Sequence, residues 1–260
     1  MKVVPVPVRE DNYAYLLIDE STNKAAAAVD PYDVAKVAAA AQTHGVEIVA
    51  GITTHHHFDH SGGNKVPFAS KYPKATIYGG SDKIPALTNL VKDKDEFAIG
   101  NNIRIKCLAT GCHTQDSICY YVTDAVKDTQ PGGIFTGDTL FIAGCGRFFE
   151  GVGSEMVKAL EYLGTLPDDV VVYNGHEYTA SNLAFAKHIE PTNPALVRLG
   201  EVIQKNKITT GLTTIGDEKE WNPFMRLDTD AVKKATGEDT KSAIMDALRD
   251  QKNKFRGSML

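Results

Sequence analysis

A dense cluster of histidines is the strongest chemical feature of the sequence. Four of the eight histidines lie within residues 55–60, and Asp59 stands among them. In an extended backbone, residues two apart point to the same side, so His55 and His57 can bind one metal ion. A turn after them would let Asp59 and His60 reach a second ion. Taken alone, the cluster is also compatible with a solvated loop or an adventitious metal patch.

Three single residues of metal-binding type occupy comparable places, just past the ends of predicted strands. They are His113 after Ile103–Leu108, Asp138 after Ile134–Thr136 and His176 after Val170–Tyr173, while the histidine cluster follows Ile48–Thr53. If the sheets place these strand ends along one edge, five imidazoles and two carboxylates gather there. Asp59 and Asp138 also have simpler roles open to them, as a helix cap and as a turn residue respectively.

Such a ligand set is suited to hydrolysis. Two divalent ions, two carboxylates and a hydroxide leave the centre with a charge of about +1 by formal count. Water bound to such ions loses its proton near neutral pH, so hydroxide is available as a nucleophile without a separate protein base. It would attack a carbonyl carbon, and an ion would stabilise the oxyanion that forms. A thiolate leaves without a strong general acid, because its parent thiol has a pKa of about 8.5, so thioesters are the favoured substrates.

The elements that must position these residues indicate an α/β fold. Apolar, β-rich runs separated by turn clusters predict strands in the first 175 residues. They cover Val3–Val8, Tyr13–Ile18, Ala25–Val29, Ile48–Thr53, Ala75–Tyr78, Ile103–Leu108, Ile118–Val122, Ile134–Thr136 and Val170–Tyr173. Helical spacing with a glycine stop predicts helices over Val34–His44 and Ser154–Leu163. Many strands against few helices predict a sandwich of sheets flanked by helices.

The pattern changes after Tyr178, where β-rich runs give way to helical spacing. Helices are predicted over Ala180–Ile189, Pro194–Lys207, Thr229–Ala235 and Thr240–Lys254. We therefore expect two domains, residues 1–175 and residues 176–260, of which the second is helical. The linker between them is short, so the helical domain is expected to pack against the first and to supply residues to a shared cleft. Asn222–Arg226 is interpreted as a packing segment that docks the helical part.

Composition excludes several classes of function. Lys and Arg total 28 against 33 Asp and Glu, a net charge of −5, which argues against binding to nucleic acid or to an anionic membrane. No apolar stretch approaches the roughly 20 residues that span a bilayer. The chain does not begin like a signal peptide, and its four cysteines include no C-x-x-C pair, so we expect reduced thiols. We expect a cytoplasmic monomer, with a mitochondrial isoform as the alternative; residues 258–260 match a peroxisomal signal only loosely.

Several motifs together resemble a known family. His-x-His-x-Asp-His, followed by single His, Asp and His residues at strand ends, resembles the metallo-β-lactamase superfamily. Thr-His-His-His-Phe-Asp-His, Thr-Gly-Asp-Thr-Leu-Phe, Gly-Cys-Gly-Arg-Phe-Phe-Glu-Gly, Gly-His-Glu-Tyr-Thr and Asn-Pro-Phe-Met-Arg resemble glyoxalase II, the hydroxyacylglutathione hydrolase family, along nearly the whole chain. The resemblance implies an αββα sandwich with a C-terminal helical domain. It also implies how the ligands divide: His55, His57 and His113 on one ion, Asp59, His60 and His176 on the other, and Asp138 bridging both.

The same resemblance implies contacts with glutathione. They fall to Arg147, Phe149, Tyr178, Arg249 and Lys252. Arg249 and Lys252 lie three apart in a predicted helix and could bind one carboxylate together, although such a pair in an unrelated protein is more often a solvated face. Arg147 stands where many members have lysine, which keeps the charge. Phe149 stands where many have tyrosine, which removes a hydroxyl and one contact with the peptide.

The implied activity is hydrolysis of S-(2-hydroxyacyl)glutathione, typically the D-lactoyl thioester, to glutathione and a 2-hydroxy acid such as D-lactate. This is the second step of methylglyoxal detoxification. Two divalent metal ions are the implied cofactors, with zinc expected and iron or manganese as alternatives, because histidine and carboxylate ligands suit all three. A glutathione persulfide dioxygenase of the same superfamily is the competing activity, and a metal-binding scaffold without catalysis is the competing class. The intact ligand set argues against the scaffold.

Overall fold

The structure is a computed structural model that describes residues 1–21, 25–127 and 129–257. Contacts divide the chain into two compact units, each built from two stretches of sequence. The first unit comprises Met1–Ala109 and Asp116–Gly137, and the second comprises Thr110–Gln115 and Asp138–Leu260. The domain boundary after residue 175 stays a prediction. The C-terminal residues that were compared with a peroxisomal signal lie outside the described residues.

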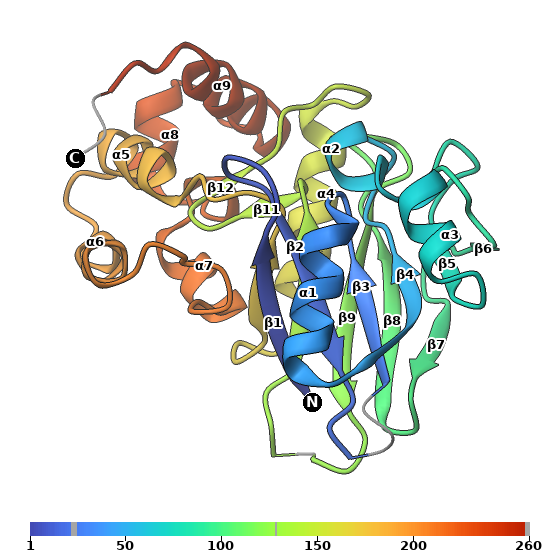
Figure 1. Cartoon of the computed structure of the whole chain (residues 1–260). Helices are drawn as coiled ribbons and strands as arrows, with labels where there is room; N and C mark the ends of the chain where they lie inside the picture. Colours follow the sequence, from blue (N-terminus) through green and yellow to red (C-terminus); the bar gives the residue numbers. More distant parts are fainter. Residues whose placement is uncertain (22–24, 128, 258–260) are drawn as a thin grey trace. The chain divides into compact units, whose positions relative to one another are not determined.

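The first unit holds a six-stranded sheet whose spatial order follows the sequence (Figure 1). Its strands are β1 (Lys2–Pro7), β2 (Tyr13–Ile18), β3 (Ala25–Val29), β4 (Glu47–Ile52), β5 (Thr76–Gly79) and β6 (Asn89–Leu90). The first three strands pair antiparallel, and β3 to β6 pair in parallel. Strands β2 and β3 are apolar and almost wholly buried, which is typical of a sheet covered on both faces.

A second, antiparallel sheet of the first unit contains β7 (Glu96–Ile99), β8 (Ile103–Ala109), β9 (Ile118–Asp124) and β10 (Gly133–Gly137). Aromatic rings pack between the two sheets. Tyr15 lies 5.2 Å from Phe135, and Tyr78 stacks on Phe97 at 3.9 Å between ring centroids. The hydroxyl of Tyr120 in β9 donates to the backbone carbonyl of Thr53 at 2.9 Å. This bond ties the second sheet to the chain just ahead of the histidine cluster.

Helix α1 (Val34–His44) covers the outer face of the six-stranded sheet (Figure 1). The Asp33 carboxylate caps its start by accepting the N–H of Lys36, and Gly45 ends it with a left-handed φ of 59°. Val37 and other buried side chains of the helix pack with strand residues in one apolar cluster. The end of the histidine cluster lies in the short helix α2 (Phe58–Ser61), and η1 (Asn64–Phe68) and α3 (Ala69–Lys71) follow it.

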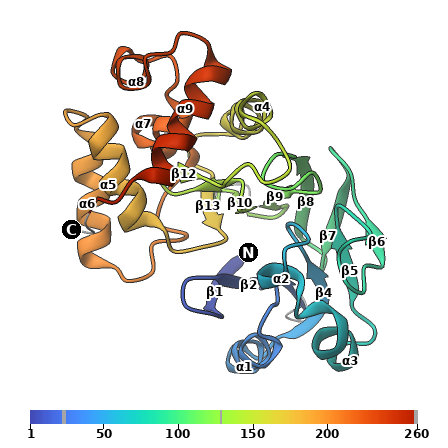
Figure 2. The same cartoon turned by 90° about the horizontal axis from the view of Figure 1, so that it is seen from above.

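The second unit is mainly helical (Figure 2). Its elements are β11 (Leu140–Phe141), β12 (Gly144–Cys145), α4 (Gly153–Gly164), β13 (Val171–Asn174), α5 (Thr179–Ile189), α6 (Ala195–Lys205), α7 (Ile215–Trp221), η2 (Pro223–Met225), α8 (Asp230–Thr236) and α9 (Lys241–Lys254). Helix α9 packs along α4, and α5 packs along α6. Trp221 at the end of α7 is buried in an apolar cluster with Ile142, Leu183 and Leu199. In the described part of the chain, no helix is long and apolar enough to cross a membrane.

The predicted elements are confirmed to within two residues at their ends, and the α/β class with a helical C-terminal part is confirmed as well. No pattern in the sequence predicted β6, β7, β11, β12, α7, η2 or the short helices near residues 58–71. Strands of two to four residues are too short to show a period, so they leave no pattern in the sequence. The hairpin of β11 and β12 matters most among them, because it follows Asp138 directly.

Candidate metal centre and substrate pocket

The seven side chains predicted to bind metal belong to both units. His55, His57, Asp59 and His60 lie in the first unit, and His113, Asp138 and His176 lie in the second. Within each unit the residues form a cluster of imidazole and carboxylate groups. The joining of the two clusters into one centre stays a prediction.

The cluster of the first unit begins just after β4. His57 is the residue before the first turn of α2, and that turn carries Asp59 and His60. Nε2 of His55 lies 3.1 Å from Nδ1 of His57, and the rings of His55 and His60 lie 4.3 Å apart. His55 and His60 are buried, whereas His57 and Asp59 are half-buried. The chain therefore gathers all four side chains at the end of one buried strand.

Asp30, at the end of β3, orients this cluster. One carboxylate oxygen accepts the N–H of Thr54 at 2.8 Å. The other oxygen accepts the Thr54 hydroxyl at 2.8 Å and lies 2.9 Å from Nδ1 of His60. Because an ionised carboxylate only accepts, Nδ1 of His60 carries the proton and Nε2 presents a lone pair, the form that binds metal. The side-chain amide of Asn12 donates a hydrogen bond to Asp59, the acidic residue of this cluster, at 2.9 Å.

Asp138 is the centre of the cluster in the second unit. Its Oδ2 atom lies 3.5 Å from Nε2 of His113 and 3.4 Å from Nε2 of His176. Nδ1 of His113 donates to the backbone carbonyl of Arg147 at 2.9 Å. A carbonyl only accepts, so Nε2 of His113 carries the lone pair and directs it towards Asp138.

The spacing of these atoms fits metal ligands. Nitrogen and oxygen ligands lie about 2.0 to 2.2 Å from zinc, so two ligands of one tetrahedral ion are about 3.3 to 3.6 Å apart. The separations of 3.5 and 3.4 Å around Asp138 match this value, and the 3.1 Å between His55 and His57 is close to it. One oxygen of Asp138 has this spacing to two histidines, as expected of a carboxylate shared by two ions. The donor atoms present therefore suit divalent metal.

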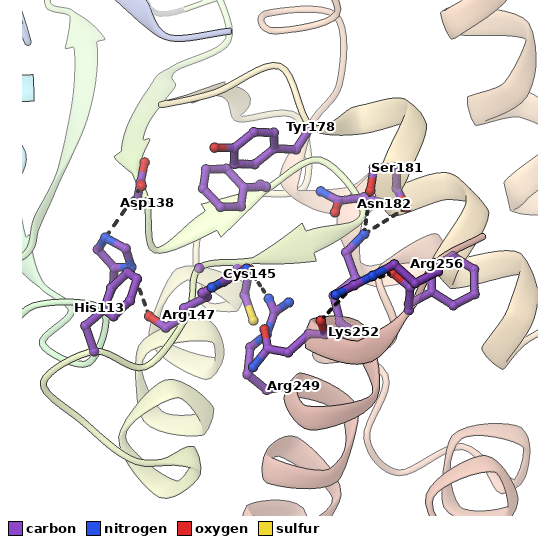
Figure 3. A pocket seen from close by; sticks show the side chains of 15 residues that line it. His113, Asp138, Cys145, Arg147, Tyr178, Ser181, Asn182, Arg249, Lys252 and Arg256 are labelled. Carbon is purple, nitrogen blue, oxygen red and sulfur yellow. Dashed lines mark hydrogen bonds and ion pairs between the residues drawn. The ribbon is translucent and has the colours of Figure 1, made fainter. Parts of the chain in front are cut away.

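A cavity of about 520 Å³ within the second unit has His113 and Asp138 in its wall (Figure 3). Four cationic side chains also line this cavity: Arg147, Arg249, Lys252 and Arg256. Cations gathered in a hollow attract an anionic ligand more strongly than the same charges spread over a surface. The chain as a whole is acidic, so this local concentration of positive charge indicates a binding site.

The two cations of α9 are held in place by the pocket wall. Arg249 is buried, donates from Nη1 to the backbone carbonyl of Cys145 at 2.7 Å and lies 5.5 Å from the ring centre of Phe224. Nζ of Lys252 donates to the backbone carbonyl and the hydroxyl of Ser181, both at 2.8 Å. Burial, and then the neighbouring charge of Arg249, lowers the pKa of Lys252 to about 8. A bound carboxylate would offset both effects.

Aromatic rings surround the cluster of the second unit. Tyr178 precedes the first turn of α5 and stacks on His176 at 4.7 Å, with the ring planes 9° apart. Phe141 contacts both of these rings edge-on. Phe149 is 61% exposed and meets the ring of His113 at 5.2 Å. These rings reduce the access of water to the donor atoms and offer apolar surface to a ligand.

Cys145 lies in the same wall but is poorly suited to act as a nucleophile. Its side chain is buried, and burial raises the pKa of the thiol to about 11 despite the nearby Arg249. The thiolate is the reactive form, and it is scarce at neutral pH at such a value.

Several pocket residues escaped the sequence analysis, among them Ser181, Asn182 and Arg256. Arg256 had a weaker signal than Arg249 and Lys252, because it lies two residues beyond the end of α9 at Lys254. Ser181 and Asn182 had none, because polar residues at the start of a helix are commonplace. Asp30 was likewise missed, since a single acid at a strand end resembles an ordinary turn residue.

Comparisons with known proteins match both parts of the chain. Residues 17–176 match the model of the metallo-beta-lactamase superfamily, and residues 177–255 match the model described as hydroxyacylglutathione hydrolase C-terminus. The chain is 42% identical to a protein of Arabidopsis thaliana named hydroxyacylglutathione hydrolase cytoplasmic, over 99% of this chain and 100% of that protein. It is 45% identical to the probable hydroxyacylglutathione hydrolase glo2 of Schizosaccharomyces pombe, over 94% of this chain and 93% of that protein. Among solved structures, ETHE1 from Myxococcus xanthus is similar, with a TM-score of 0.64, 25% identity and coverage of 96% of this chain and 97% of that one.

Proposed function

Because the chain belongs to the hydroxyacylglutathione hydrolase family of the metallo-β-lactamase superfamily, we propose that it hydrolyses S-(2-hydroxyacyl)glutathione thioesters. The D-lactoyl thioester is the expected substrate, with glutathione and D-lactate as products. The observation that carries this proposal is the pocket of the second unit, where His113 and Asp138 share one cavity with four cationic side chains. A thioester of an anionic peptide needs both features, a reactive cluster for its carbonyl and cations for its carboxylates.

We propose that the clusters hold two divalent metal ions, with zinc expected and iron or manganese as alternatives. The ligands of one ion would be His55, His57 and His113, those of the other Asp59, His60 and His176, with Asp138 shared. When bound, the ions would polarise the thioester carbonyl and activate the attacking water. The protein contributes the orientation of the ligands: Asp30 fixes the proton of His60 on Nδ1, and the Arg147 carbonyl does the same for His113.

The pocket residues would bind and orient the glutathione part. Arg249 and Lys252 are proposed to bind a carboxylate, and Arg147, Phe149 and Tyr178 to contact the peptide. The thiolate that leaves has a parent pKa of about 8.5 and departs without a proton donor.

We further infer a monomer that acts in the cytoplasm and binds neither nucleic acid nor membrane. The name of the Arabidopsis relative supports the compartment, and the net charge of −5 supports the absence of polyanionic partners. Light scattering of the purified protein tests the oligomeric state, and a mass of two chains would contradict the inference.

Thiol release from S-D-lactoylglutathione tests the proposed function. The metal-loaded protein should release free thiol, and Asp138→Ala should lower kcat by about a thousandfold or more, because it removes a shared ligand. Asp169→Ala, which changes an exposed acid of the same unit, is the matched control and should retain wild-type kcat. Undiminished turnover in Asp138→Ala would contradict the bridging role. Oxygen uptake with glutathione persulfide in place of thiol release would contradict the hydrolase and favour a dioxygenase.

A further inference from the structure

The hairpin 138–147 makes its turn in a buried place. Strands β11 and β12 pair Leu140 with Cys145 and Phe141 with Gly144, which leaves only Ile142 and Ala143 in the turn. Both turn residues are fully buried, and Ala143 has a left-handed φ of 56°. Buried backbone groups need hydrogen-bond partners, and a left-handed alanine persists only where its surroundings hold it.

Side chains from distant elements supply those partners. Nδ2 of Asn182 donates to the Ile142 carbonyl at 3.0 Å, the Glu218 carboxylate accepts the Ala143 N–H at 2.8 Å, and Nδ2 of Asn222 donates to the Gly144 carbonyl at 3.0 Å. Three consecutive residues, the two of the turn and Gly144 after them, are thus each bound by a different side chain. The turn is therefore shaped by α5 and by the end of α7 rather than by its own sequence.

Glu218 and Asn222 form one bonded pair at the end of α7. Nδ2 of Asn222 donates to Glu218 at 2.9 Å, and the indole N–H of Trp221 donates to the other carboxylate oxygen, also at 2.9 Å. Both residues of the pair are fully buried. A buried carboxylate bound by neutral N–H groups is costly to maintain, and burial raises the pKa of Glu218 to about 8. An apolar side chain would pack there at lower cost, so general packing does not explain the acid.

The open end of the hairpin bears a predicted metal ligand and the carbonyl group that orients His113. Asp138 precedes β11, and Arg147 follows β12 and offers its carbonyl to Nδ1 of His113. Between them, Gly146 packs so closely on the Asp138 carbonyl that a β-carbon would not fit. Arg249 also donates to the backbone of β12, at the Cys145 carbonyl. Any shift of the turn is passed through two-residue strands to these groups.

We propose that Glu218 and Asn222 are positioning residues, which hold the turn of hairpin 138–147 and thereby set the Asp138 carboxylate and the Arg147 carbonyl that orients His113. The inference rests on the proposed function, which it deepens. It also revises the interpretation of Asn222–Arg226 as a packing segment, since the Asn222 side chain binds the hairpin that bears a predicted metal ligand. Neither residue touches substrate, so both act through the hairpin.

Two variants test the proposal in full-length protein. Asn222→Ala removes the donor to the Gly144 carbonyl. At about pH 9, where Glu218 is ionised, Glu218→Gln keeps the shape of the side chain but turns one accepting oxygen into a donor that faces N–H groups. The matched controls are Asn206→Ala and Glu220→Gln, which change exposed residues of the same unit. For each protein we would measure kcat and KM with S-D-lactoylglutathione, the rate of metal loss to a chelator, and the unfolding temperature.

Groups that orient metal ligands typically change activity or metal affinity by about 10- to 100-fold when they are removed. We therefore expect both variants to lose kcat by about this factor at temperatures well below unfolding, with a smaller change in KM, and to lose metal faster than the controls. A lower unfolding temperature with wild-type kcat and wild-type metal loss would overturn the proposal, because it would show a structural role alone.

The conservative variant keeps the test decisive if Asn222→Ala fails to fold, since Glu218→Gln preserves side-chain volume. Metal loss is measured without substrate, so it separates this proposal from the proposed function. If wild-type protein does not cleave the thioester but the variants still lose metal faster, only the proposed function fails. Wild-type metal retention in Glu218→Gln overturns the positioning role whatever the substrate.

Discussion

Arg249 and Lys252 differ in how firmly they keep their charge. An arginine side chain stays protonated throughout the working pH range of a protein. The pKa of Lys252, in contrast, is lowered to about 8 by burial and by the adjacent Arg249. Its ammonium is held by two oxygens of Ser181 rather than by an acid. One of the two cations proposed to bind the glutathione carboxylate therefore titrates just above neutral pH.

This difference predicts a pH dependence of substrate capture. Lys252 is charged below its pKa of about 8 and neutral above it, so kcat/KM for S-D-lactoylglutathione should fall as the pH rises through that value. In Lys252→Arg the charge persists, and the fall should disappear. Lys254→Arg changes an exposed lysine of the same helix and should keep the wild-type profile. A fall that survives in Lys252→Arg would assign the titration to another group.

At the scale of elements, α9 and hairpin 138–147 mark the limits of what the sequence could predict. Helical spacing located α9 to within one residue and put Arg249 and Lys252 on one face. The hairpin has strands of two residues, and its turn bends at Ala143 without the glycine that usually marks a left-handed residue. Side chains of α5 and α7 impose that bend. Such long-range contacts leave no periodic trace in a single sequence, so the hairpin could not be predicted.

The raised pKa of Glu218 predicts how the stability of the protein depends on pH. Burial raises its pKa from 4.5 to about 8, so the folded state holds the proton more tightly than the unfolded state does. The stabilisation is complete below about pH 4.5 and is lost as the pH rises through about 8. One pKa unit corresponds to about 1.4 kcal/mol, so a loss of a few kcal/mol is expected.

Glu218→Gln does not titrate and isolates this effect. The unfolding temperature of wild type minus that of Glu218→Gln should decrease between pH 5 and pH 8 and then level off, on the scale of about 2 to 4 °C per kcal/mol. Calorimetry at several pH values measures it. Glu220→Gln, on the exposed face of the same helix, should show a nearly constant difference from wild type. A constant difference for Glu218→Gln as well would show that the acid keeps an ordinary pKa in the folded protein.

For the whole molecule, the net charge and the charge of the pocket have opposite signs. The chain carries a net charge of −5, yet four cationic side chains line one cavity of the second unit. The net charge argues against polyanionic partners, but it could not say where the cations gather. The seven predicted ligands stand out in the sequence by residue type and by their position after strands. The lining of the pocket was not, because Ser181, Asn182 and Arg256 meet only through the packing of α5 with the end of the chain.

The two clusters of donors also predict how the whole chain responds to removal of metal. Lone pairs of imidazole nitrogens and carboxylate oxygens that face one another at 3.1 to 3.5 Å repel unless a proton or a cation lies between them. An ion that binds only the folded state stabilises it by about 4 kcal/mol at a thousand times its dissociation constant. At about 2 to 4 °C per kcal/mol, chelation should lower the unfolding temperature by roughly 8 to 16 °C and abolish thiol release. Returning zinc, iron(II) or manganese(II) in turn should restore both properties to different degrees and identify the preferred ion.

Asp138→Ala lacks the shared ligand and should lose less stability on chelation than Asp169→Ala, which keeps every ligand. Equal unfolding temperatures with and without metal in the wild type would mean that these donors hold no structural ion, and the proposed hydrolysis would then lack its cofactor.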